Sequence, residues 1–169
     1  VAELETGLAS QTMPIADALK AWTGRERVSV VFDTTRDGWD KAKFMEVLGT
    51  PPNAVIVVTE EGDVFGACVS VSVRGCGWYT DKGQFAFSFF SHGRCDVPRM
   101  WIMRPDRWAS GRDVGVLNTT EDYFIQFGYD EGFFHIHKEK TGSWIWKTSR
   151  RFWGMDDDVL TGKVRGRFT

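Results

Sequence analysis

The chain has 169 residues, the ordinary size of a single globular domain. Its 21 basic and 23 acidic residues give a formal net charge of −2, so the overall charge points to neither a nucleic-acid partner nor an anionic membrane surface. Eight tryptophans and thirteen phenylalanines favour ring-rich, half-buried sheets over helices.

Residues 1–24 are predicted to form a helical appendage that precedes a single domain at residues 25–169. Pro14 has the position of a first helical residue, and Gly24 can end the helix. One helix face carries apolar residues at i, i+4 and i+7, namely Ile15, Leu19 and Trp22. Such a stripe fits a helix that docks on the sheet or, alternatively, one that binds a partner protein.

A β-branched run from Val28 to Phe32 predicts a strand, and a turn is expected at residues 33–38. A short helix is then predicted from about Asp40 to Leu48, with Asp37 as its cap and Asp40 in the positive first turn. Gly49, followed by two prolines, ends this helix. Its buried stripe is predicted to consist of Phe44, Val47 and Leu48.

From Ala54 onward the sequence predicts short strands separated by glycine-bearing turns. The strands Ala54 to Thr59 and Val64 to Val73 are joined by a hairpin turn at Glu61-Gly62-Asp63. Gly66, inside the second strand, indicates a bulge or the close approach of another backbone. This pattern predicts an α+β, mainly β fold: an antiparallel two-sheet β-sandwich with a few short flanking helices.

The order and spacing of these elements resemble the TLDc domain family from about Arg27 to Phe134. An Asp-Gly turn leads into a helix with an inward phenylalanine, and a Glu-Gly hairpin leads into a Phe-Gly strand. An aromatic F-x-F-S strand and a second Phe-Gly element follow. The residues that carry the resemblance are Asp37, Gly38, Phe44, Gly62, Phe65, Gly66, Phe85, Phe87, Phe127 and Gly128. The C-terminal part departs from the family pattern, because the usual Cys-x-Thr-Phe element is missing.

The resemblance implies an intracellular protein-interaction domain that has no cofactor and is not an enzyme, since TLDc proteins have no agreed active site. The family is linked to oxidative-stress resistance and to the vacuolar proton ATPase. Subunits of that pump are therefore the expected protein partners.

The three cysteines are odd in number and form no C-x-x-C motif, which indicates free thiols in a reducing compartment. No apolar run reaches the roughly 18 residues of a membrane span, and no secretory hydrophobic segment is present. We therefore expect a cytoplasmic protein without membrane insertion, with a nuclear location as the alternative.

An alternative hypothesis makes the chain a thiol-dependent enzyme. Cys76 is flanked by glycines in a loop and could act as a nucleophile if a histidine lay beside it in space. An ordinary free thiol in a turn explains the same residue. No G-x-S-x-G, S-x-x-K or phosphate-binding motif supports other chemistry.

A zinc-dependent enzyme is the related alternative, with His135 and His137 as candidate ligands. The two histidines lie at i and i+2 of a predicted strand, so both imidazoles should share one face. Cys95 or an acidic residue would have to complete the site, but the spacing indicates no third or fourth ligand. Two solvent-facing histidines opposite a buried Phe134 and Ile136 face explain the pattern without a metal.

The last alternative is a nucleic-acid-binding domain, because rings and cations alternate between Trp144 and Trp153. Rings beside cations can stack bases while they neutralise phosphates. The candidate surface consists of Trp144, Trp146, Lys147, Arg150 and Arg151. A strand with inward tryptophans and outward basic residues gives the same pattern.

Overall fold

A computed structural model of the chain describes residues 15–91, 97–102, 116–118, 123–128, 134–137, 143–145 and 166–167. The chain divides into two compact units, Val1–Val31 and Phe32–Thr169. In the first unit, residues 15–23 form the predicted helix, which ends where the Gly24 N–H donates to Lys20 O at 2.9 Å. Gly24 has a φ of 67°, a left-handed conformation that glycine adopts without strain.

Among the described residues, no helix combines the length and the apolar character that a membrane span requires.

The strand predicted from Val28 to Phe32 is wrong, because residues 27–33 form neither helix nor strand. The side chains of Val28, Val30 and Val31 are exposed. Strand propensity reflects packing against neighbouring strands, so β-branched residues at the surface do not by themselves make a strand.

Two helices follow at the start of the second unit. Helix α2 (Thr34–Asp37) is a single turn where only a turn was predicted, and Asp33 caps it by accepting from the Thr35 N–H at 2.8 Å. Helix α3 (Lys41–Leu48) confirms the predicted helix. Its N-cap is Asp40, not Asp37 as predicted, since the Asp40 carboxylate accepts from the Lys43 N–H at 3.1 Å.

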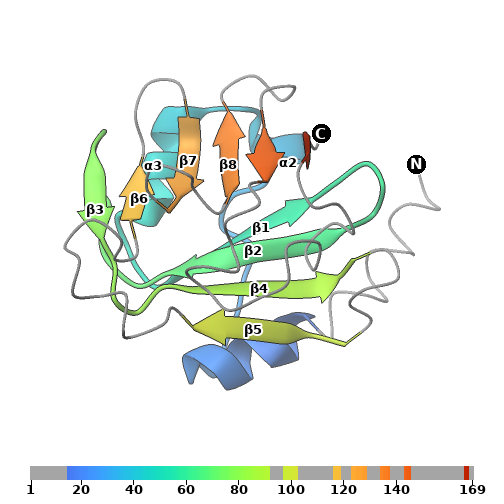
Figure 1. The fold of residues 1–169 in the computed structure, drawn as a ribbon. Helices are drawn as coiled ribbons and strands as arrows, with labels where there is room; N and C mark the ends of the chain where they lie inside the picture. The colour runs from blue at the N-terminus through green and yellow to red at the C-terminus, as the bar shows by residue number, and fades with distance from the viewer. Residues whose placement is uncertain are drawn as a thin grey trace. The chain divides into compact units, whose positions relative to one another are not determined.

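The first sheet is antiparallel, with the strand order β1-β2-β4-β5 (Figure 1). Its strands are β1 (Asn53–Val58), β2 (Val64–Val69), β4 (Phe85–Phe90) and β5 (Arg99–Ile102). The predicted β1–β2 hairpin is confirmed, with Gly62 at a φ of 89° in its turn. Strand β2 ends at Val69, earlier than predicted, because the amide of Ser70 donates to Asp81 instead of continuing the ladder.

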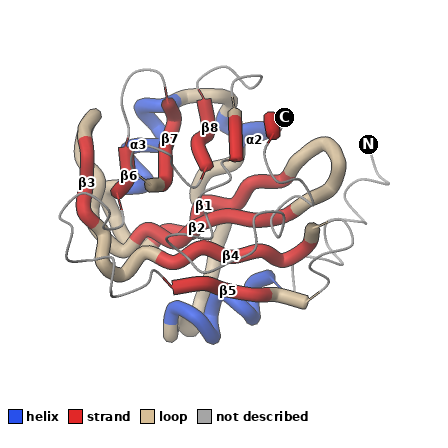
Figure 2. The backbone as a smooth tube through the Cα atoms, viewed as in Figure 1, coloured by secondary structure: helices blue, strands red, loops and turns tan. Residues whose placement is uncertain are grey.

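The second sheet is also antiparallel and has the order β10-β9-β8-β7-β6-β3 (Figure 2). Its strands are β3 (Trp78–Thr80), β6 (Val116–Asn118), β7 (Tyr123–Phe127), β8 (Phe134–His137), β9 (Trp144–Ile145) and β10 (Gly166–Arg167). The described chain is therefore mainly β, with antiparallel sheets and a few short helices.

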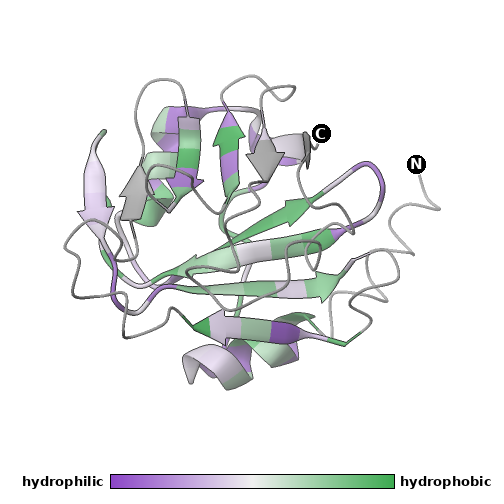
Figure 3. Ribbon diagram, in the orientation of Figure 1, coloured by the Kyte–Doolittle hydropathy of each residue, from purple (hydrophilic) through white to green (hydrophobic). Residues whose placement is uncertain are grey.

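The core of the second unit joins residues from α3 and from both sheets. The β1–β2 register sets Val55 opposite Ala67 and Val57 opposite Phe65, all four buried on one face. The Phe65 ring meets Phe134 of β8 edge-on, with centroids 5.4 Å apart. Figure 3 shows hydrophobic residues along β1 and β2 and hydrophilic ones at the turn between them.

The opposite face of the first sheet is equally apolar at its centre. Phe85, Phe87 and Phe89 alternate along β4 and are buried, with neighbouring ring centroids 6.2 and 5.0 Å apart. All six residues of β2 are buried. This strand therefore lacks the in–out alternation of a half-exposed strand.

Candidate functional site

An open cleft of about 410 Å³ lies between α3 and the segment that follows β2. Its lining side chains belong to Ala42, Met45, Glu46, Thr50 and Arg74; Gly49, Val73 and Gly75 also line it, and the Val73 side chain is buried in the core. The helix contributes one exposed edge to this cleft because residues three and four apart share a face. The cleft therefore combines an apolar floor with one acidic and one basic residue.

Backbone and hydroxyl hydrogen bonds tie the loop after β2 to the end of α3. The Val73 N–H donates to Leu48 O at 3.1 Å. The Ser72 hydroxyl donates to Gly49 O at 2.7 Å and accepts from the Arg74 Nε–H at 3.3 Å. These bonds fix the two walls of the cleft relative to each other, and they satisfy carbonyls that the helix end leaves open.

Tyr79 holds the loop from the side of β3. Its hydroxyl lies 2.8 Å from Arg74 O and 3.0 Å from Gly75 O, so its proton can be shared between the two carbonyls. Gly75 has a φ of 92° with no atom within 4 Å of its Cβ position, so the loop needs glycine here for its backbone conformation alone. Cys76 is exposed in the loop that Tyr79 holds, and Trp78, at the start of β3, is half-exposed.

The charges in the cleft are separated. Glu46 lies in the last turn of α3, which carries no basic residue, and the C-terminal end of a helix has a partial negative charge. Arg74 belongs to the other element that lines the cleft, the segment after β2. Within the described ranges no ion pair joins the two side chains. The cleft can therefore offer an acceptor and a donor of opposite charge to one ligand.

The structure does not bring the predicted thiol nucleophile together with the predicted histidines. Cys76 precedes β3, whereas His135 and His137 lie on β8, and β6 and β7 separate these strands. Three strand spacings amount to about 14 Å. The third cysteine, Cys95, lies outside the described residues.

Cys68 is a different kind of thiol. Burial, followed by the charge of Asp81, raises its pKa to about 12. Such a thiol stays protonated at neutral pH and serves as a small apolar core residue.

Both candidate zinc ligands lie beside one tyrosine, Tyr123. The Tyr123 ring centroid is 4.8 Å from that of His135 and 5.8 Å from that of His137. His135 is 7% exposed, so the interpretation of two solvent-facing histidines is wrong for this residue. In the described part of the chain, no three His, Cys, Asp or Glu side chains are grouped as a metal would require.

Asp37, the first residue of the Asp-Gly pair, organises the turn between α2 and α3. Its carboxylate accepts from the Asp33 N–H at 2.9 Å, from Arg36 Nη2–H at 2.6 Å and from Lys43 Nζ–H at 2.9 Å. The hydrogen bond from Arg36, and then the one from Lys43, hold the pKa of Asp37 well below its usual range. Gly38 follows with a φ of 73° and lets the chain turn into α3.

The remaining residues that suggested a family lie in the core or at strand ends. Phe44 is buried, and its ring centroid is 5.6 Å from that of Phe124. Phe127 packs on Phe134 at 4.8 Å, and Gly128 ends β7 with a φ of 88°. These residues support the fold and form no shared surface.

The predicted nucleic-acid surface falls largely outside the described residues. Trp144 is described by its backbone, as the first residue of β9. Trp146, Lys147, Arg150, Arg151 and Trp153 lie outside the described part.

Sequence reasoning missed Asp81, which is 1% exposed. Its carboxylate accepts from the Ser70 N–H at 2.7 Å, from the Gly83 N–H at 3.0 Å and from the Ser70 hydroxyl. The Asp-Lys-Gly turn was the available signal, but it did not reveal that the carboxylate reaches the end of β2.

No protein-family model matches this chain, and no curated protein matches it with significance.

Proposed function

We propose that this chain is a non-catalytic protein-interaction domain that uses the clamped loop at residues 72–79 and the adjoining cleft. The observation that carries the proposal is the exposure of Arg74 and Trp78 on a backbone fixed by Tyr79 and Ser72. Tryptophan and arginine are enriched among the residues that dominate protein interfaces.

Rigidity supports the same conclusion. A loop already held in one conformation loses little conformational freedom when it binds, so more of its contact energy appears as affinity. The hydrogen bonds of Ser72, Val73 and Tyr79 provide that fixation before any partner arrives.

We further propose a TLDc-like identity, with the two antiparallel sheets stacked as a sandwich and a cytoplasmic role in oxidative-stress resistance. The order of the Asp-Gly turn, the Phe44 helix and the Phe65-Gly66 strand supports this proposal. On this basis subunits of the vacuolar proton ATPase are the first partners to test.

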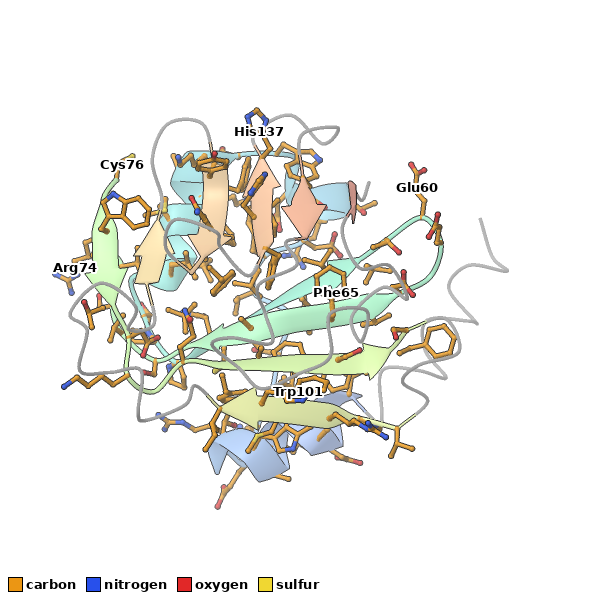
Figure 4. The ribbon with its side chains drawn as sticks, in the orientation of Figure 1. Glu60, Phe65, Arg74, Cys76, Trp101 and His137 are labelled. Carbon is orange, nitrogen blue, oxygen red and sulfur yellow. The ribbon has the colours of Figure 1, made fainter. Side chains whose placement is uncertain are left out.

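The test is direct binding of the purified chain to the purified soluble sector of that pump, followed by partner capture from its native lysate. Arg74→Ala and Trp78→Ala should each weaken binding at least several-fold, while Glu60→Ala should not. Glu60 is exposed in the β1–β2 turn, at the other end of the sheet from Arg74 (Figure 4). Thermal melting of each variant shows that the fold is kept.

The proposal fails if neither the pump nor any reproducible partner is bound. It also fails if binding is unchanged when Arg74 and Trp78 are replaced together.

A further inference from the structure

We propose that the cleft beside α3 binds an extended peptide segment of a protein partner, in which one apolar side chain lies between a basic and an acidic residue. This inference rests on the proposed interaction function and specifies its ligand. It follows from the separation of charge across an apolar floor.

The apolar floor of the cleft is the reason to expect an apolar side chain in the ligand. Ala42 and Met45 of α3 supply the apolar side chains of the cleft, and Met45 also packs against the core, to which the buried Val73 belongs. The volume of about 410 Å³ lies in the range of pockets that take small ligands or single side chains with their backbone. A methionine wall adapts to different apolar shapes, which suits a peptide side chain.

Glu46, on the α3 wall of the cleft, is the reason to expect a basic residue in the ligand. Glu46 is exposed in a last helical turn without any basic residue, next to the negative end of the helix. A lysine or arginine of the ligand would neutralise this carboxylate and interact favourably with the helix end. No side chain in the described ranges already forms an ion pair with Glu46.

Arg74, on the loop wall of the cleft, is the reason to expect an acidic residue in the ligand. The Arg74 Nε–H is held by Ser72, which orients the guanidinium, and Arg74 forms no ion pair in the described part. A planar guanidinium can bind a carboxylate through two parallel hydrogen bonds. The ligand must therefore present its acidic residue on the side opposite its basic residue.

The experiment is selection of a phage-displayed library of random nonapeptides on the full chain, followed by affinity measurement with a labelled synthetic consensus peptide. We expect enriched peptides with a basic–apolar–acidic pattern. Glu46→Lys and Arg74→Glu should each weaken binding of the consensus about two- to fivefold, as expected for an ion pair at a partly exposed site. Glu60→Lys, a charge reversal in the distant β1–β2 turn, should leave the affinity unchanged.

A peptide with its two charges exchanged gives the sharpest comparison. The Glu46→Lys, Arg74→Glu double variant should prefer the exchanged peptide over the original, while the parent prefers the original. A variant that merely misfolds would bind neither peptide, and thermal melting identifies it.

The inference is overturned if no peptide is enriched, if the enriched peptides lack the charge pattern, or if the double variant keeps the parent's preference. If the chain still binds a protein partner in any of these cases, the interaction function is supported, but the cleft is not its binding site. Loss of all partner binding overturns the function itself.

Discussion

The ring of Phe87 occupies the space that a side chain at Gly66 would need. A Cβ atom built on Gly66 would lie 2.8 Å from the edge of that ring and would also collide with Val55 O. Gly66 pairs with Phe87 across the β2–β4 ladder and with Ile56 across the β1–β2 ladder. The close approach of these two groups therefore requires glycine at this position.

Gly66→Val should lower the free energy of unfolding by about 3 kcal/mol, because the valine must displace both a packed ring and a backbone carbonyl. Urea denaturation measures the change. Ala54→Val is the matched control, since it adds volume at an exposed position of the neighbouring strand β1. Equal free energies of unfolding for the two variants would show that β2 and its neighbours can shift to accommodate a side chain at Gly66.

Asp81→Asn should lower the free energy of unfolding by about 1–3 kcal/mol. The substitution replaces one carboxylate oxygen, which accepts hydrogen bonds from Ser70 or Gly83, by an amide NH₂ group, which can only donate. A double-mutant cycle with Ser70→Ala isolates the part that the serine hydroxyl contributes. We expect a coupling energy above about 0.5 kcal/mol, as found for residues in one hydrogen-bond network. Additive effects would contradict the shared network.

The stability of the second unit should fall in acid partly through Asp37. Its pKa is lower in the folded chain than in the unfolded chain, so the unfolded chain takes up the proton first as the pH falls. The contribution of this carboxylate is present above a pH of about 4 and is lost progressively below it.

The difference in melting temperature between the parent and Asp37→Asn should therefore be largest near neutral pH and should shrink toward a pH of about 2. Added salt should reduce the difference as well, since the partners Arg36 and Lys43 are exposed cations. Glu60→Gln serves as the control, because Glu60 forms no ion pair in the described part of the chain. A difference that stays constant with pH would contradict the role of Asp37.

Cys76 should react with a thiol reagent in the folded protein, while Cys68 should react only on unfolding. Cys76 is exposed, whereas Cys68 is buried with a pKa of about 12. At a pH of about 8 only about one such buried thiol in 10,000 is ionised. Mass spectrometry of alkylated peptides, with and without urea, gives the two rates. Labelling of Cys68 as fast as Cys76 would place it at the surface.

The sequence predicted elements whose signals are local. Helix α3 has its acidic cap, apolar stripe and terminal glycine within one short segment, and the β1–β2 hairpin has its Glu-Gly turn between two apolar runs. The strand predicted from Val28 to Phe32 failed because its pattern carried no information about a neighbouring strand. The N-cap was misplaced for a related reason, since Asp37 and Asp40 are equally suitable by type and only the geometry of α2 separates them.

The cleft was beyond sequence reasoning because its walls meet only in the folded chain. Glu46 and Arg74 line the same cleft because the hydrogen bond between Val73 N–H and Leu48 O joins a helix end to a distant loop. Neither residue belongs to a motif. Tyr79 likewise gave no local signal that its hydroxyl would reach back to Arg74 O and Gly75 O.

The central position of β2 in the first sheet should make its amide protons slow to exchange with solvent. Strand β2 has a bonded neighbour on each side, β1 and β4, and all of its residues are buried. Its amide protons cannot reach deuterated solvent by fraying of an edge or by local loop opening. They should therefore be among the last to exchange, and their exchange should follow the complete opening of the unit that contains them.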